Sequence, residues 1–260
     1  MRLRPRRAAA LSATAAAAVA LSIALSVMLS PAALPAVSAT AAASGQASTV
    51  GALFTLTRDG ELGDHFCTGS VVDSPGGDLI LTAAHCVSQS SVGTVVFVPG
   101  YGNGKGSFGN WTVTRVIVDA KWSSSRDPDD DFAFLVVGQA GATTPIEDLT
   151  GGEVIGIDEP AGRAVEVAGY PNGLGQPISC ENTALSFSPT QYQFNCDGFT
   201  DGTSGSPLLA GGIAAGGADT VIGVIGGYQK GGATASVSYA ARFSTDLAGL
   251  YRQALQQSGA

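Results

Sequence analysis

The sequence predicts an all-β protein made of two six-stranded antiparallel β-barrels and a C-terminal helix. The 260 residues include 36 glycines, roughly twice the usual share, which favours a fold with many turns over a helical bundle. From residue 50 onward, short runs rich in Val, Ile and Phe alternate with turn segments rich in Gly and Pro, the pattern of an antiparallel β protein. About six such runs lie in each half of the chain, the number that a small closed barrel needs.

Each expected strand is short and bounded by turn residues. In the first half these strands are residues 50–57, 66–72, 78–82, 94–98, 111–119 and 132–137. In the second half they are residues 164–170, 178–187, 191–196, 207–210, 221–227 and 233–239. A polar stretch at residues 138–152 separates the two halves, so we expect the first barrel at about 50–137 and the second at about 153–243.

The only segment with helical spacing is the C-terminal tail, at about residues 245–257. Ser244 or Thr245 can cap its start, because a side-chain hydroxyl there accepts from a free backbone N–H. The apolar residues that share one helical face are Leu247, Leu250, Tyr251 and Leu255.

The first 43 residues are interpreted as a signal peptide and a short leader, which leaves residues 44–260 for the folded domain. Four arginines among the first seven residues precede an uncharged Ala/Leu/Val run at residues 8–29, and cleavage is expected near residues 37–41. An uncleaved membrane anchor is the alternative, because the run is long enough to span a bilayer. The Ala/Ser/Pro-rich segment at residues 30–44 favours cleavage. We therefore expect a secreted, extracellular protein without membrane contact.

The part of the chain beyond the leader is acidic. It keeps nine basic and all 21 acidic residues, a net charge of −12. Nucleic-acid binding needs clustered Lys and Arg, and here these residues are scattered singly, so nucleic acid is not an expected partner.

Four cysteines in an exported chain indicate two disulfides. Pairing Cys67 with Cys86 and Cys180 with Cys196 closes two short loops and is preferred, while the two other pairings remain open. No Cys-x-x-Cys or His-x-x-x-His spacing occurs, so neither zinc nor any other cofactor is expected.

Three segments carry residues suited to nucleophilic catalysis. They read Leu-Thr-Ala-Ala-His-Cys at 81–86, Asp-Asp-Asp-Phe-Ala-Phe-Leu at 129–135 and Asp-Gly-Thr-Ser-Gly-Ser-Pro at 201–207. A serine hydroxyl is a weak nucleophile until a base takes its proton, and histidine titrates in the right range to do so. A carboxylate can orient that histidine, as in the Ser-His-Asp template.

In this order and on an all-β chain, the three segments resemble the chymotrypsin-like (trypsin-fold) serine peptidases, over roughly residues 50–243. The resemblance implies that Ser204 is the nucleophile, His85 the base and Asp131 the orienting acid. It also implies that the backbone N–H groups of Gly202 and Ser204 form the oxyanion hole.

Each of these roles has an alternative within the same segments. Asp129 and Asp130 are alternatives to Asp131. Only Asp131 begins the family's pattern Asp-φ-Ala-φ-Leu, in which φ is an apolar residue of the strand. Ser206 competes with Ser204, but Ser204 occupies the nucleophile position of the family's Gly-Asp-Ser-Gly-Gly-Pro motif. A calcium loop at residues 127–138 fails, because it lacks the glycine and the glutamate that such loops require.

Thr203 departs from the pattern of the animal digestive enzymes, which carry there an aspartate that pairs with a new N-terminal ammonium. A threonine cannot form this ion pair. The segment is more similar to the bacterial secreted members, including the glutamyl-endopeptidase-like branch, so activation by N-terminal insertion is not expected.

The resemblance implies a substrate pocket walled by two segments. Gly198 occupies the position of the aspartate with which trypsins bind Lys or Arg, and Asp201 lies close to it in sequence. Ile225 stands where the glutamate-specific branch has a histidine. The backbone of Gly226 to Tyr228 is expected to pair with an extended polypeptide substrate.

Taken together, the sequence predicts a monomeric secreted serine endopeptidase that acts on polypeptides through an acyl-enzyme. Two alternatives remain. One is a catalytically silent protein that uses the same fold to bind a partner, and the other is a selective esterase or processing peptidase.

Overall fold

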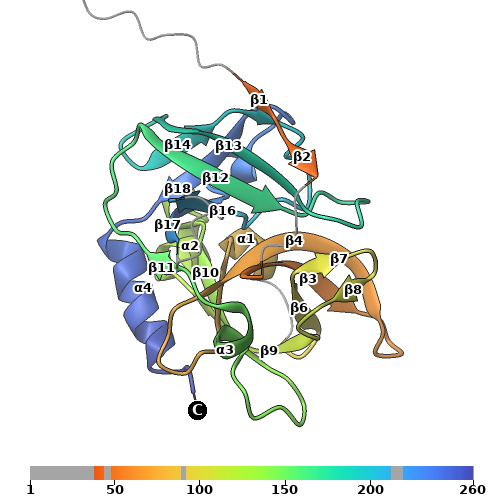
Figure 1. Ribbon diagram of the computed structural model, residues 1–260. Coiled ribbons are helices and arrows are strands. Elements are labelled where there is room, and N and C mark those ends of the chain that lie inside the picture. The colour runs from red at the N-terminus through yellow and green to blue at the C-terminus, as the bar shows by residue number, and fades with distance from the viewer. Residues whose placement is uncertain (1–37, 44–47, 89–91, 212–218, 260) are drawn as a thin grey trace, which may run out of the picture. The chain divides into compact units, whose positions relative to one another are not determined.

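The strands form two six-stranded antiparallel β-barrels, as the sequence predicts (Figure 1). The computed structural model describes residues 38–43, 48–88, 92–211 and 219–259. The apolar run at residues 8–29 and the expected signal peptide therefore lie outside the described residues.

The first barrel closes in the strand order β10-β5-β4-β3-β6-β9. Its strands are β3 (Val50–Leu56), β4 (Leu62–Val72), β5 (Leu79–Thr82), β6 (Val95–Pro99), β9 (Trp111–Val118) and β10 (Ala133–Gly138). Side chains such as Leu53, Ile80, Phe97 and Leu135 are fully buried in one core cluster, because alternate residues of each strand point into the barrel.

The second barrel closes where β17 pairs with β18, with Ile225 opposite Ala240. Its strands are β12 (Arg163–Gly169), β13 (Ile178–Ser186), β14 (Gln191–Phe194), β16 (Pro207–Ala210), β17 (Thr220–Ile225) and β18 (Ser238–Arg242). Val167, Leu208 and Ile222 are fully buried in its core.

The last expected strand, residues 233–239, is displaced toward the C-terminus. The chain after β17 first forms a 3-10 turn at Tyr228–Gly231, and β18 begins only at Ser238. Gly231 and Gly232 have φ values of 103° and 134°, a region open to glycine but not to strand residues. Residues 231–235, which follow this turn, line a cavity instead.

The expectation of a single helix is wrong. The described part of the chain has three short α-helices besides the C-terminal one: α1 (Ala84–Val87), α2 (Ala120–Ser125) and α3 (Ile146–Thr150). They are too short to give a helical period in the sequence. Of these three, only α2 has a side-chain N-cap, in which the Asp119 carboxylate accepts from Lys121 N at 2.7 Å.

Several two-residue strands were also not predicted. They are β1 (Ala39–Thr40), β2 (Ala42–Ala43), β7 (Tyr101–Gly102), β8 (Lys105–Gly106), β11 (Val154–Ile155) and β15 (Cys196–Asp197). β1 pairs in parallel with β15, and β2 pairs with β13. The sequence assigned residues 39–43 to the leader, but Ala42–Ala43 extend the sheet of the second barrel, and Ala39–Thr40 form a separate two-stranded sheet with β15.

Helix α4 (Thr245–Leu255) is the expected C-terminal helix. Ser244 caps it by accepting from Asp246 N at 3.2 Å. Leu247 and Leu250 are buried in a core cluster with Phe134 of the first barrel and Val224 of the second, so α4 helps to hold the two barrels together. Within the described residues, no helix is long and apolar enough to cross a membrane.

Candidate active site

His85 and Asp131 are directly hydrogen-bonded. His85 lies on α1, and its Nδ1 is 2.7 Å from Asp131 Oδ2. Asp131 follows the 3-10 turn Pro128–Asp130 and is fully buried, whereas 15% of the His85 side chain is exposed. A carboxylate can only accept here, so Nδ1 carries the proton and Nε2 is left as a base.

Two backbone N–H groups also hold the Asp131 carboxylate. His85 N donates to Oδ1 at 2.8 Å, and Gly227 N donates to Oδ2 at 2.8 Å. Gly227 belongs to the segment after β17, so both barrels contribute to fixing this acid. Its φ of 73° and ψ of −126° are open to glycine only.

The three consecutive aspartates have three different environments. Asp129 Oδ1 accepts from Gln191 Nε2 at 2.8 Å. Asp130 lies 3.9 Å from Lys121 Nζ, and burial, reinforced by the charge of Asp119, raises its pKa to about 6. Among the three, only Asp131 is hydrogen-bonded to His85 in the described structure.

Gln191 is a connecting residue that the sequence analysis missed. This buried side chain of β14 donates to Pro128 O at 3.0 Å as well as to Asp129, and it accepts from Tyr228 N at 3.2 Å. It therefore ties the turn before Asp131 to the segment after β17. No sequence pattern predicts this connection, because the bond between Tyr228 and Gln191 joins elements more than thirty residues apart.

Ser204 and Ser206 differ in accessibility. Ser204 is half-buried and lines a cavity. Ser206 is fully buried, and its hydroxyl packs so closely on Gly169 that a Cβ there would meet it at 2.1 Å. Of these two hydroxyls, only that of Ser204 can meet a substrate in the cavity.

The segment carrying Ser204 packs closely against the start of α1. Gly205 has a φ of 84°, and a Cβ on it would come within 2.1 Å of Thr68 O and 3.1 Å of Ala83 N. Glycine is thus required for this approach. Among the described residues, no hydrogen bond joins Ser204 Oγ to His85 Nε2; such bonds often tighten only when substrate binds.

The backbone around Ser204 offers two free donors. The N–H groups of Gly202 and Ser204 make no backbone hydrogen bond within the described part of the chain, whereas Thr203 N donates to Thr200 O at 3.1 Å. Gly202 has a φ of 96°. Two free N–H groups beside an accessible serine hydroxyl make an arrangement that can bind an oxyanion.

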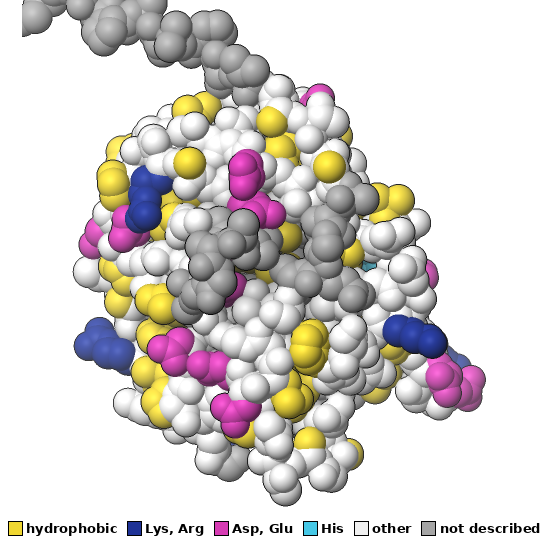
Figure 2. Space-filling view, in the orientation of Figure 1, with side chains coloured by type: hydrophobic (Ala, Val, Ile, Leu, Met, Phe, Trp, Pro, Cys, Tyr) yellow, Lys and Arg dark blue, Asp and Glu magenta, His cyan; other side chains and the backbone are white. Residues whose placement is uncertain are grey.

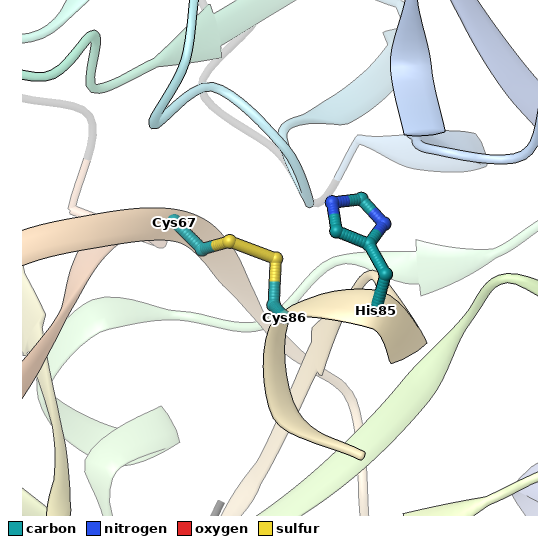
Figure 3. A group of neighbouring side chains, drawn as sticks. All are labelled: Cys67, His85 and Cys86. Atoms are coloured by element: carbon teal, nitrogen blue, oxygen red, sulfur yellow. A yellow bond between two sulfur atoms is a disulfide. The ribbon is translucent and has the colours of Figure 1, made fainter. Parts of the chain in front are cut away.

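Both disulfides form in the pairing preferred from the sequence, Cys67–Cys86 and Cys180–Cys196. Cys67–Cys86 joins β4 to α1 beside His85 (Figure 3). The three residues are the only cluster of metal-binding types in the described ranges. Because the two sulfur atoms are bonded to each other, this cluster cannot ligate a metal.

The other histidine, His65, lies on β4 outside this hydrogen-bonded group. Its Nε2 is 3.1 Å from Leu174 O, and its ring contacts Phe54, Tyr101 and Tyr170 edge-on or tilted. The ring of His65 is therefore half-buried in an aromatic cluster.

The cavity beside Ser204 has a volume of about 440 Å³. Of the pocket residues expected from the sequence, Asp201 and Ile225 line it, while Gly198, Gly226 and Tyr228 do not. Phe199 is buried in its wall, and the exposed Lys230 adds a cation that the sequence analysis missed. Lys230 lies in the segment that was expected to lead into a strand.

The segment from Gly226 to Tyr228 is already hydrogen-bonded within the protein. Gly226 N donates to Tyr239 O at 3.0 Å, and the next two N–H groups donate to Asp131 and Gln191. The expected pairing of this segment with a substrate strand stays a prediction that can use only carbonyl groups, because all three N–H groups are donated within the protein. Gly227 O accepts from Lys230 N at 2.9 Å, and the Gly226 carbonyl remains as an acceptor.

Acidic and basic side chains are distributed differently on one face of the molecule. On the face shown in Figure 2, the Lys and Arg side chains stand apart from one another, while several acidic side chains lie close together.

Three of the solved structures that share this fold are proteases. The protease Anisep from Arthrobacter nicotinovorans matches with a TM-score of 0.69 at 23% identity, over 82% of this chain and 98% of that one. A thermostable serine protease from an extremophilic microorganism matches with a TM-score of 0.67 at 26% identity, over 81% and 98%. A Glu endopeptidase matches with a TM-score of 0.65 at 18% identity, over 84% and 98%.

Comparison with curated sequences finds no significant match. The model of the trypsin-like peptidase domain, by contrast, matches residues 67–212, which is more than half of the chain and includes the three segments that carry His85, Asp131 and Ser204. The matched family and the two-barrel fold agree with each other, and the chain belongs to the trypsin-like peptidase family.

Proposed function

We propose that this protein is a secreted serine endopeptidase that hydrolyses peptide bonds through an acyl-enzyme on Ser204. The observation that supports the proposal most is the pairing of His85 Nδ1 with the buried Asp131 carboxylate at 2.7 Å. It leaves Nε2 as a base for the cavity-lining hydroxyl of Ser204.

In the first step, His85 Nε2 takes the proton of Ser204 as its oxygen attacks the substrate carbonyl. Asp131 stabilises the imidazolium that forms, and the donors from His85 N and Gly227 N keep this carboxylate in place. The imidazolium then gives its proton to the leaving amine, and the C–N bond breaks. Water attacks the remaining ester by the same route in reverse, which frees Ser204.

In this proposal, the N–H groups of Gly202 and Ser204 stabilise the negative charge that develops on the attacked carbonyl oxygen. Their donors are not used elsewhere in the backbone of the described residues. Such preorganised donors contribute about two to three orders of magnitude to turnover each.

The substrate side chain before the cleaved bond is assigned to the cavity of about 440 Å³. Ile225 and Phe199 give it an apolar wall, and Asp201 and Lys230 give it one group of each charge. Gly198, Gly226 and Tyr228 stay in the proposal as neighbours of this cavity, with the Gly226 carbonyl as an acceptor for the substrate backbone.

Export is supported by the two disulfides, which persist in oxidising compartments, and by the basic and apolar start of the sequence. The mechanism requires no cofactor. A monomer is sufficient for it, since His85, Asp131 and Ser204 all come from one chain.

The direct test is labelling of the secreted, purified protein with a fluorophosphonate, followed by peptide mapping. We expect the label on Ser204 alone, since the reagent reacts with activated serine hydroxyls. Ser204→Ala should abolish labelling, while Ser206→Ala keeps it. A digest of a peptide library in parallel identifies the bonds that are cleaved.

Each departure from this result contradicts a specific part of the proposal. No labelling of folded protein contradicts an activated serine and favours the silent binding protein. Labelling without cleavage of any library peptide favours a selective esterase or processing enzyme. Labelling of Ser206 contradicts Ser204 as the nucleophile and identifies Ser206 instead.

A further inference from the structure

The buried hydroxyl of Thr68 is hydrogen-bonded on both sides. Thr68 lies on β4 and is fully buried. Its Oγ1 donates to Gly202 O at 3.0 Å, and it accepts from Tyr170 N at 3.0 Å. A carbonyl can only accept and an N–H can only donate, so these two partners fix the direction of the hydroxyl proton.

The backbone of Thr68 adds further contacts to the same region. Thr68 N donates to Ser204 O at 2.8 Å, and Thr68 O accepts from Thr82 Oγ1 at 2.7 Å. One residue of the first barrel therefore contacts the segment with the proposed oxyanion hole at both Gly202 and Ser204.

The three peptide units from Asp201 to Ser204 are each held through a carbonyl. Asp201 O accepts from Asn172 N at 2.7 Å, and Thr203 O accepts from Ser206 N at 3.0 Å. The N–H of a trans peptide points away from its carbonyl, so these two bonds turn the N–H groups of Gly202 and Ser204 the other way. The middle carbonyl, that of Gly202, is held by Thr68 Oγ1.

Gly202 needs a hydrogen bond to hold it, because a glycine does not fix its own backbone conformation. Its φ of 96° is accessible to glycine alongside several other conformations. No carboxylate at position 203 can fix the loop, since Thr203 Oγ1 donates locally to Thr200 O at 2.7 Å. Of the bonds to the three carbonyls, only the one from Thr68 comes from a side chain.

We propose that Thr68 is a positioning residue: by holding the Gly202–Thr203 peptide, which lies between the N–H groups of Gly202 and Ser204, it keeps the loop in the conformation required for the oxyanion hole. This inference rests on the proposed function. Thr68 touches neither substrate nor the reacting atoms, so its loss should reduce stabilisation of the transition state more than binding of the substrate.

The test compares Thr68→Val, which has nearly the same shape without the hydroxyl, with Thr68→Ser, which keeps the hydroxyl. The control is Ser70→Ala on the same strand, because the Ser70 hydroxyl is fully buried without a partner. For each variant, kcat and KM are measured on one cleaved peptide, together with the inhibition constant of a peptide aldehyde, whose adduct carries an oxyanion. Melting temperatures check folding.

For Thr68→Val we expect kcat to fall by about 10- to 1,000-fold with KM nearly unchanged, and aldehyde affinity to fall in parallel. Thr68→Ser should retain most of kcat, and Ser70→Ala should match the parent chain. If Thr68→Val does not fold, Thr68→Ala takes its place, because it adds no methyl group against the Gly202 carbonyl.

A folded Thr68→Val enzyme with unchanged kcat overturns the role of Thr68. So does a folded Thr68→Ser enzyme that has lost as much kcat as the variants without a hydroxyl. A parent chain that cleaves no peptide and takes no fluorophosphonate contradicts the proposed function itself, which separates the two failures.

Discussion

The two sides of the proposed active site are built differently. On one side, the His85–Asp131 pair is held by buried hydrogen bonds that come from both barrels. On the other side, the pocket wall from Lys230 to Ala235 is a turn segment with many exposed residues. The reacting groups are thus rigidly positioned, while the surface that selects the substrate rests on a loop.

This difference separates two kinds of information in the chain. The hydrogen-bonded side depends on a few residue types in a fixed setting, and changes there should affect turnover for every substrate. The loop side depends on shape and charge, and changes there should affect the ranking of substrates. Substitutions on each side can test this separation.

The largest effect is expected at the acid. Asp131→Asn keeps the shape of the side chain but can no longer fix the tautomer of His85, and the equivalent change in a well-characterised Ser-His-Asp triad lowers kcat by about 10⁴-fold. Steady-state kinetics on any cleaved peptide measures it. The matched control is Asp129→Asn, which leaves the bonds of Asp131 intact and should change kcat by far less.

If Asp129→Asn or Asp130→Asn lost as much turnover as Asp131→Asn, the three environments would not be functionally distinct. The role of the orienting acid would then have to be reassigned among Asp129, Asp130 and Asp131.

The second prediction compares the disulfides. Their sequence separations are similar, 19 and 16 residues, so removing either one should cost about 3 kcal/mol of unfolding free energy. Only Cys67–Cys86 lies beside His85, between α1 and the strand that carries Thr68. Below both unfolding transitions, the Cys67→Ala/Cys86→Ala double variant should therefore lose about tenfold or more in kcat.

The Cys180→Ala/Cys196→Ala double variant should be similarly destabilised but keep its kcat. Denaturant unfolding and kinetics on both variants decide the matter. Equal losses of kcat in the two variants would mean that the first disulfide has no special effect on the site.

The same separation explains how far the sequence could be interpreted. The barrels were predictable because each strand is a short apolar run between turn residues. His85, Asp131 and Ser204 could be assigned because their flanking residues resemble a known pattern. Thr68 and Gln191 could not, because their functions come from contacts with Gly202 and with Asp129 that only folding creates.

The part of the pocket wall from Lys230 to Ala235 was missed for a related reason. Its residues have no required type, and the glycines at 231 and 232 replace an expected strand by turns. Lys230 has no regular spacing from any other pocket residue, so no sequence pattern identifies it.

The third prediction concerns Lys230. Among the described residues, no carboxylate lies within ion-pair distance of its ammonium group, and it lines the cavity with Asp201. Lys230→Glu should lower kcat/KM for substrates with an acidic side chain before the cleaved bond and raise it for basic ones. Because Lys230 is exposed, each change should be only about two- to fivefold. Matched peptides that differ at this one position measure it.

Lys105→Glu, an exposed lysine on β8 that does not line the cavity, makes the same change in net charge and is the control. If both variants shift the preference equally, the effect comes from overall charge and not from the pocket.

The smallest expected effect is at Asp130, which neighbours the acid but does not touch His85. Burial and the charge of Asp119 raise its pKa from 3.8 to about 6 in the folded protein. The groups that face it are Asp119, Lys121, Asp127 and Asp246, and the adjoining cavity is also lined by Asp129, Asp158 and Arg242. The folded state therefore binds the proton more tightly than the unfolded state. The contribution of Asp130 to the free energy of unfolding is largest below about pH 4, decreases as the pH rises and is lost above about pH 6.

Asp130→Asn removes this ionisation while keeping the shape of the side chain. Its melting temperature should exceed that of the parent chain at pH 8, and the difference should shrink as the pH falls to 4. The reverse trend would mean that the attraction of Lys121 at 3.9 Å outweighs burial. Turnover at pH 8 should change little, since the hydrogen bonds of Asp131 do not involve the Asp130 carboxylate. A large loss of turnover would mean that Asp130 also helps to position the His85–Asp131 pair.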